Sequence, residues 1–195
     1  MPKPALVGAA LLLLLNLSSL AAALYANFAE QRLDLLPDLR ASRASALAAA
    51  LAPWSATHRA LHGWVLGDSG DFESAQAAYL GALRRAPADA LLWAEYAQVL
   101  GRNRVFDERL TAATQRALAL APASPAVRQG ISRMALAYGL FGEGPVRELW
   151  RQNLRWELDH SRETFLHTVQ QDGYRRAFCL KYAPDLGESA WCASP

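Results

Sequence analysis

Lysine, cysteine and β-branched residues are all scarce in this chain. Lys3 and Lys181 are its only lysines, and valine, isoleucine and threonine are rare beside alanine and leucine. Because alanine and leucine favour helices and β-branched residues favour strands, the composition predicts an all-α protein. The formal net charge is only +2, so the basic surplus that is typical of nucleic-acid-binding proteins is missing and no nucleic-acid partner is expected.

Charge is absent from one long segment near the N-terminus. Residues 4–29 contain no charged side chain, and about 20 apolar residues suffice to cross a bilayer. Lys3 precedes this segment, whereas Glu30, Arg32 and Asp34 follow it. Positive charge on the leading side predicts a single-pass anchor in a bacterial inner membrane, with the N-terminus cytoplasmic and the body periplasmic.

A cleaved signal peptide is the alternative interpretation, since small residues at 21–23 would suit a peptidase. The apolar run is longer than a usual signal-peptide core and continues without a break into a helical pattern, which favours the anchor. Within it, Asn16, Ser18 and Ser19 are candidates for a contact face with another membrane helix, because small and polar residues join helices in membranes. The alternative is that they are merely tolerated in a single-pass helix.

Only two cysteines are present, Cys179 and Cys192, both near the C-terminus. In an exported protein such a pair most simply forms a disulfide. Their spacing is not the C-x-x-C of redox or haem-attachment motifs, so neither of those functions is predicted, and no cofactor is expected.

Turn signals recur regularly from about residue 54, at 67–72, 85–89, 100–107, 121–125 and 140–145. Helical runs of about a dozen residues separated by short turns predict successive antiparallel helix pairs. The expected organisation is an anchor at 1–31, a linker helix at 32–53, helix pairs at 54–144 and a C-terminal helical cap at 145–195.

The helix pairs also repeat in sequence. Ala75, Tyr79, Ala82 and Pro87 align with Leu110, Thr114, Ala117 and Pro122, and Gly63 and Leu66 align with Ala97 and Leu100. Together with the Trp93, Tyr96, Ala97, Leu100 pattern, this resembles the tetratricopeptide repeat, whose unit has 34 residues. The likeness is strongest over 56–89, and Leu110 and Thr114 depart from the family's small and aromatic positions. It implies a solenoid of about 2.5 repeats in which Gly63 and Ala75 lie where two helices touch.

The resemblance also implies a binding surface. In proteins with this repeat, the first helix of each unit lines a concave groove. The residues at groove-facing positions here are Trp64, Gln98, Arg102, Gln129 and Arg133, an aromatic, amide and arginine set that suits an extended peptide or an acidic tail. The alternatives are that these faces are simply solvated, or that the C-terminal helical region fills the groove.

Other candidate sites are weaker. His58 and His62 share the i,i+4 spacing of some metal ligands, but they lack the glutamate and the third ligand of a zinc site, so core packing or exposure is predicted and no metal. Interleaved charges predict a solvated, ion-paired helix face; they are Arg147, Arg151, Arg155, Arg162, Arg175 and Arg176 with Glu148, Glu157, Asp159 and Glu163. No nucleophile motif, phosphate loop or paired carboxylate is recognisable, so an enzyme is not predicted.

The sequence therefore predicts a non-enzymatic periplasmic scaffold, anchored in the membrane through residues 4–29, that binds or organises a membrane protein complex. Such a complex would belong to envelope-polysaccharide, pilus or secretion, or cytochrome-maturation machinery. Two alternatives stay open. One is a structural subunit held in a membrane complex through its anchor helix, and the other is a module that binds a small ligand or glycan.

Overall fold

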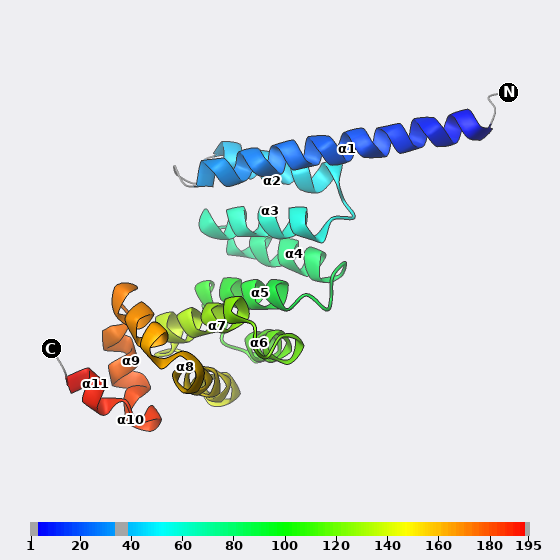
Figure 1. Cartoon of the computed structure of the whole chain (residues 1–195). Coiled ribbons are helices and arrows are strands. Elements are labelled where there is room, and N and C mark those ends of the chain that lie inside the picture. The colour runs from blue at the N-terminus through cyan, green and yellow to red at the C-terminus, as the bar shows by residue number, and fades with distance from the viewer. Residues whose placement is uncertain (1–3, 34–38, 194–195) are drawn as a thin grey trace. The chain divides into compact units, whose positions relative to one another are not determined.

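The computed structural model (Figure 1) describes residues 4–33 and 39–193 and divides the chain into two units, Met1–Pro87 and Ala88–Pro195. Every regular element in the described residues is a helix, which confirms the all-α prediction. The first unit contains α1 (Pro4–Leu33), α2 (Leu39–Leu51), α3 (Ala56–Asp68) and α4 (Phe72–Leu83). The second contains α5 (Ala90–Arg102), α6 (Glu108–Leu120), α7 (Pro125–Tyr138), α8 (Gly144–Gln171), α9 (Arg175–Lys181), α10 (Ala183–Leu186) and α11 (Ser189–Ala193).

The helices begin and end where local signals predict. Asp71 and Asp89 each accept a hydrogen bond from a backbone N–H of the first helical turn that follows, at the starts of α4 and α5. Such caps satisfy donors that have no partner within the helix. Pro145 stands in the first turn of α8, where its missing N–H costs nothing. The capping residues and prolines therefore determine where these helices begin.

Helices α3 and α4 form the close pair that the repeat pattern predicts. A Cβ at Gly63 would lie 2.8 Å from Tyr79 Cδ2 and 3.3 Å from the Ala75 carbonyl oxygen. Tyr79 and Ala75 are themselves buried, so the ring cannot move away at low cost. The glycine is required here by the close approach of two helices, as predicted.

Helices α1 and α2 form a similar pair, which the sequence did not reveal. Ala29 of α1 clusters with Ala41 and Ala44 of α2 and with Leu61 and Val65 of α3. The alanines Ala22, Ala29, Ala41 and Ala48 are fully buried. Figure 1 shows α2 lying along the C-terminal part of α1, whose N-terminal part extends beyond it.

This first pair carries the repeat one unit further toward the N-terminus. Ala41, Ser45, Ala48 and Pro53 stand 34 residues before Ala75, Tyr79, Ala82 and Pro87, and Ala29 stands 34 before Gly63. The segment predicted as a linker helix therefore packs as the second helix of a hairpin, and the C-terminal turns of α1 supply the first.

The apolar character of α1 is described only in part. Side chains are described for residues 13–29 of this helix, so the beginning of the predicted membrane segment, residues 4–12, lies outside the described side chains. No helix in the described part of the chain is both long enough and apolar enough to cross a membrane.

The second unit closes with α9–α11, which are held by three kinds of contact. Cys179 and Cys192 form the predicted disulfide, with their Cα atoms 5.6 Å apart. Arg162 of α8 donates two hydrogen bonds to the Glu188 carboxylate at 2.7 and 3.0 Å. The buried Tyr182 hydroxyl donates to the Ala135 carbonyl of α7 at 3.2 Å. The C-terminal region thus docks on α7 and α8.

Candidate binding pocket

The five residues predicted to line a groove are distributed over both units. Trp64 lies on α3 of the first unit and is 47% exposed. The other four lie on neighbouring helices of the second unit, Gln98 and Arg102 on α5 and Gln129 and Arg133 on α7. That all five line one groove stays a prediction, while the second unit's four define a surface that is described below.

The α5 residues lie against α7. A Cβ at Gly130 would be 2.8 Å from Gln98 Nε2, so the amide of Gln98 occupies the space above this glycine. Burial raises the pKa of the Tyr138 phenol, and the positive charge of Arg102 opposes this shift. Both α5 side chains are therefore close to α7.

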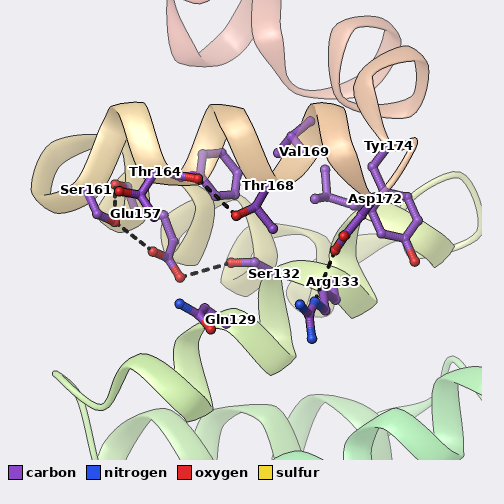
Figure 2. A pocket seen from close by; sticks show the side chains of 12 residues that line it. Gln129, Ser132, Arg133, Glu157, Ser161, Thr164, Thr168, Val169, Asp172 and Tyr174 are labelled. Atoms are coloured by element: carbon purple, nitrogen blue, oxygen red, sulfur yellow. Dashed lines mark hydrogen bonds and ion pairs between the residues drawn. The ribbon is translucent and has the colours of Figure 1, made fainter.

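The α7 residues line a hollow against α8 (Figure 2), which contains about 390 Å³ of empty space, part of it open to solvent. In the close-up, side chains of α7 and of the second half of α8 face each other across it. The lining consists of Gln129, Ser132, Arg133, Leu136, Glu157, Ser161, Thr164, Phe165, Thr168, Val169, Asp172 and Tyr174.

Three lining residues of the hollow belong to a continuous chain of five hydrogen-bonded polar side chains that we call the polar ladder: Arg128, Asn153, Ser132, Glu157 and Ser161. Arg128 Nη1 donates to Asn153 Oδ1 at 2.8 Å, and Asn153 Nδ2 donates to Ser132 Oγ at 2.8 Å. Ser132 Oγ donates to Glu157 Oε1 at 3.5 Å, and Ser161 Oγ donates to Glu157 Oε2 at 3.1 Å.

Helical spacing explains why these residues meet. Arg128 and Ser132 are four residues apart on α7, and Asn153, Glu157 and Ser161 are four apart on α8, so each set shares one helix face. The facing stripes are polar where most helix contacts are apolar. Asn153 and Ser132 are buried and all their described bonds run along this seam.

Helix α8 is broken at Ser161, at the edge of the hollow. This residue has φ −149° and ψ 39°, outside the helical region, and its hydroxyl oxygen also lies 3.2 Å from the Glu157 carbonyl oxygen, a second acceptor for the same hydrogen. The helix is therefore kinked at this residue. The kink directs the second half of α8 across α7.

Glu157 has the most perturbed environment in the hollow. It is only 5% exposed, and burial raises the pKa of its carboxyl. Hydrogen bonds from Ser161 and Ser132 and the charges of Arg128 and His160 oppose this shift without cancelling it. A buried carboxyl with hydroxyl and amide neighbours suits hydrogen bonding to a donor group or a cation.

Helix α8 borders the α7 part of the predicted groove, where Gln129 and Arg133 remain exposed. Arg133 Nε lies 3.2 Å from Asp172 Oδ2 at the end of α8, and this exposed pair forms the rim of the hollow (Figure 2). Gln129 and Arg133 thus lie beside the C-terminal helical region, and both the open groove and its filling by that region stay predictions.

The prediction that the charged residues form a solvated, ion-paired helix face is confirmed for Glu148 and wrong for Glu157. Glu148 and Arg151 pair at 2.8 Å at the surface, as the spacing predicts. Glu157 points instead into the seam between α7 and α8, because it lies four residues from the fully buried Asn153. The signal available in the sequence was this Asn153, Glu157, Ser161 spacing, which matches the Arg128, Ser132 spacing of α7.

His62 has a structural contact. Its Nδ1 is 3.0 Å from Ser45 Oγ, which links α3 to α2, and burial, followed by the charge of Arg59, lowers its pKa. His58 is half-buried on the same helix. Across the described residues, no three histidine, cysteine or acidic side chains are grouped as a metal site would require.

The membrane-contact candidates lie on the described part of α1. Ser18 Oγ donates to the Leu15 carbonyl of its own helix at 2.9 Å, a bond that satisfies the hydroxyl in an apolar setting. Asn16 and Ser19 are exposed. Their role as a helix contact stays a prediction.

Comparison with known proteins adds no family. No family model matches this chain, and no curated protein matches it.

Proposed function

We propose that this protein is a membrane-anchored helical-repeat scaffold that binds a protein partner in or beside the membrane. The proposal rests on the difference between the two faces of α1, one of which is apolar and exposed while the other is buried. Leu13, Leu17, Leu20 and Leu24 are 58–63% exposed, whereas Ala22 and Ala29 on the same helix are fully buried against the hairpin stack. Contiguous exposed apolar surface of this kind is typical of membrane or partner contact.

The length of α1 supports an anchor. Ala22 is the first side chain of the described part of α1 that is fully buried. Residues 4–21, ahead of it, extend about 27 Å at 1.5 Å per residue, near the thickness of the hydrocarbon core. The helix would thus cross the membrane with its first part and enter the repeat with its last turns.

The packing of α2 on α1 limits where a partner of the first unit would lie. Because α2 packs along α1, the first unit is joined to the anchor by a helix contact and has little freedom to move away from the membrane surface. A partner reached by this unit would therefore lie at the membrane, as a subunit of an integral complex does. The envelope-polysaccharide, pilus or secretion, and cytochrome-maturation machineries contain such complexes.

Membrane attachment is the first test. The full-length chain expressed in its own host should stay with membranes after alkaline extraction, and a reporter fused to the C-terminus should be active only on the periplasmic side. Release of the intact chain by alkaline extraction would overturn the proposal.

Partner binding is the second test. After cross-linking and purification in mild detergent, mass spectrometry should identify one membrane complex in stoichiometric amount. Arg102→Glu on α5 should reduce its recovery, whereas Arg116→Glu, an exposed arginine on α6, should not. Recovery of the chain alone would overturn the scaffold proposal.

One observation favours a second candidate function, the binding of a small ligand. Glu157 lies buried in a hollow lined by hydroxyls and an amide, an arrangement found in specific ligand sites. A ligand screen by thermal shift tests this candidate. A compound that stabilises the wild-type chain should lose its effect on Glu157→Gln, and equal stabilisation of both proteins would exclude this site.

A further inference from the structure

A second hollow, in the first unit, differs from the first in being almost wholly apolar. It lies between α1 and α2 and contains about 770 Å³ of empty space, part of it open to solvent. Leu24, Tyr25 and Phe28 of α1 line it together with Leu47 of α2, and these four side chains are 39–63% exposed. We call it the α1–α2 groove. No described helix of the first unit covers these side chains.

One layer further along the stack, the corresponding face is covered by a helix. Helices α1 and α2 form the first layer and α3 and α4 the next (Figure 1), and Phe28 corresponds to His62 at the 34-residue spacing of the repeat. His62 Nδ1 is 3.0 Å from Ser45 Oγ of α2, and the neighbouring Leu61 clusters with Ala41 of α2. In the second hairpin this face of the first helix therefore packs against the helix that precedes it.

Tyr25 leads to the same conclusion. Its counterpart is Arg59, whose Nε donates to the Pro53 carbonyl, just beyond the end of α2, at 3.4 Å. The α1 side of the groove thus carries two residues whose counterparts contact the preceding helix or the residue that follows it. The groove therefore occupies the place of one further helix, about as long as the 13 residues of α2.

The charge that the groove offers to such a helix is positive. Arg40 and Arg43 line it, and no described acidic residue does. Arg40 already has an interaction within the chain, so the charge offered to an occupant is that of Arg43, whose side chain is exposed. The counterpart of Arg43 in the second hairpin is Ala77, so the stacking of hairpins does not itself require an arginine at this position.

We propose that the α1–α2 groove binds one amphipathic helix of the partner protein, with an apolar face and an acidic residue at the edge of that face. The apolar face packs on Leu24, Phe28 and Leu47, and the acidic residue pairs with Arg43. Apolar grooves bind helices through side chains spaced three and four residues apart, and complementary charge fixes the orientation. The inference rests on the proposed scaffold function and goes beyond it by naming the surface and the kind of segment that it binds.

Position and charge favour this occupant over a lipid chain and over a second copy of the protein. Residues 24–28 lie about 5–10 Å along α1 from the end of segment 4–21, which is proposed to cross the bilayer, so the groove lies outside the hydrocarbon core. Two copies joined groove to groove by a two-fold axis would bring two positively charged surfaces together, which is unfavourable.

Photo-cross-linking of the full-length chain in its own host tests the inference. Benzoylphenylalanine in place of Leu47 should cross-link to one protein of the membrane complex. Mass spectrometry of the cross-linked peptide should find an amphipathic helical segment that contains aspartate or glutamate. The matched control is the same probe in place of Leu80, a leucine of α4 that is 40% exposed and does not line the groove. It should give no cross-link to that segment.

A charge exchange tests the role of Arg43. Arg43→Glu should lower the yield of this cross-link roughly tenfold, because like charges would then face each other. Arg43→Lys should keep most of the yield, and Arg84→Glu, at an exposed arginine of the same unit outside the groove, should leave it unchanged. Arginine in place of the acidic residue of the cross-linked segment should restore the yield with Arg43→Glu, which would not happen if Arg43→Glu had only disturbed folding.

The outcomes separate the groove from the scaffold proposal. Cross-links from position 47 only to lipid, only to a second copy of the chain or to a segment without an acidic residue would overturn the groove inference. A yield that Arg43→Glu leaves unchanged would do the same. If the complex is recovered in stoichiometric amount but position 47 does not reach it, the scaffold proposal stands and the groove inference fails. If no complex is recovered, the scaffold proposal fails and the groove inference falls with it.

Discussion

The hairpins of the first unit and the α7–α8 pair of the second are joined by opposite means. Between α3 and α4, contact is made by removing side-chain bulk, with Gly63 under the Tyr79 ring. Between α7 and α8, contact includes the polar ladder, in which Asn153 and Ser132 are buried and hydrogen-bonded across the seam. One pair is close because its residues are small, and the other is held by partners that must match.

The difference teaches how each contact specifies its geometry. Small apolar residues let helices approach closely, but an alanine surface accepts more than one register along the helix axis. Buried polar groups are costly unless every donor meets its acceptor, so the ladder permits one register of α8 on α7. We infer that the ladder is what positions the second half of α8 over Gln129 and Arg133.

Breaking the ladder at its centre should have the largest effect. Asn153→Ala would remove the bonds that Arg128 Nη1, the Ser132 hydroxyl and the Arg128 carbonyl make with this amide at the buried centre of the ladder. We expect the free energy of unfolding of the second unit to fall by about 3–5 kcal/mol. Hydrogen exchange of α7 and α8 amides at increasing urea measures it.

Asn103→Ala, at the half-buried end of α5, is the control and should change stability by about 0.5 kcal/mol or less. Replacing four of the five ladder residues together, by Arg128→Met, Ser132→Ala, Asn153→Leu and Glu157→Met, should recover much of the loss, because the remaining Ser161 hydroxyl keeps the Glu157 carbonyl as its acceptor. A loss from Asn153→Ala no larger than from Asn103→Ala would show that the ladder adds nothing.

Removing the disulfide should affect the second unit alone, because both cysteines of the sequence lie there. For Cys179→Ser with Cys192→Ser we expect a loss of about 3 kcal/mol, the entropy that a loop of this size gains when it is opened. Exchange of α9 amides should accelerate while that of α3 and α4 stays constant. Equal acceleration in both units would contradict the assignment.

At the Gly63 contact we expect a smaller loss of stability, which a closely matched glycine variant can test. Gly63→Ala should destabilise the first unit by about 1–2 kcal/mol, because the buried Tyr79 ring must shift. Gly81→Ala is the matched control, since its Cβ would meet Arg59 at 3.4 Å, an ordinary contact. In that variant the free energy of unfolding should stay the same or rise by up to about 1 kcal/mol, because alanine has the higher helix propensity. Pulse proteolysis compares the two, and identical behaviour would refute the close approach.

The smallest expected effect is a pH dependence through Glu157. Burial raises the pKa of this carboxyl in the folded state, so the folded chain holds the proton more tightly than the unfolded chain. The stability of the second unit should therefore fall as pH rises from the unfolded pKa through the folded one. Glu157→Gln should remove this fall and be the more stable protein at neutral pH, as urea titrations across pH measure. If the stability of Glu157→Gln depended on pH in the same way as that of the wild-type chain, the raised pKa of a buried Glu157 carboxyl would be refuted.

Local chemistry made most of the helix boundaries predictable. Asp71 and Asp89 cap helices, Pro145 starts one and Pro87 follows the end of another, and each of these effects depends on a few neighbouring residues. The close contact at Gly63 was also predictable, because a repeated small residue reports a repeated helix crossing. The disulfide was predictable because only two cysteines exist to form it.

The alanine face of α1 could not be predicted in the same way. Ala22, Ala26 and Ala29 lie inside an apolar run, where every residue is apolar whether it faces lipid or protein. The apolar run therefore predicted an anchor followed by a linker, and the packing of α2 on α1, together with the 34-residue spacing from Ala29 to Gly63, shows that the repeat begins within α1.

Sequence by itself determined the helical class, the helix lengths, the small residues at the α3–α4 crossing and the cysteine pair, because these follow from composition, caps and spacing along the chain. Tertiary structure decided which charged residues are buried. Glu157 and Glu148 are nine residues apart and so lie on opposite faces of α8, and one lies in a seam whereas the other is in solvent. The two residues differ because α7 packs on the face of α8 that carries Glu157 and not on the face that carries Glu148. The contact between α7 and α8 joins residues that are distant in sequence.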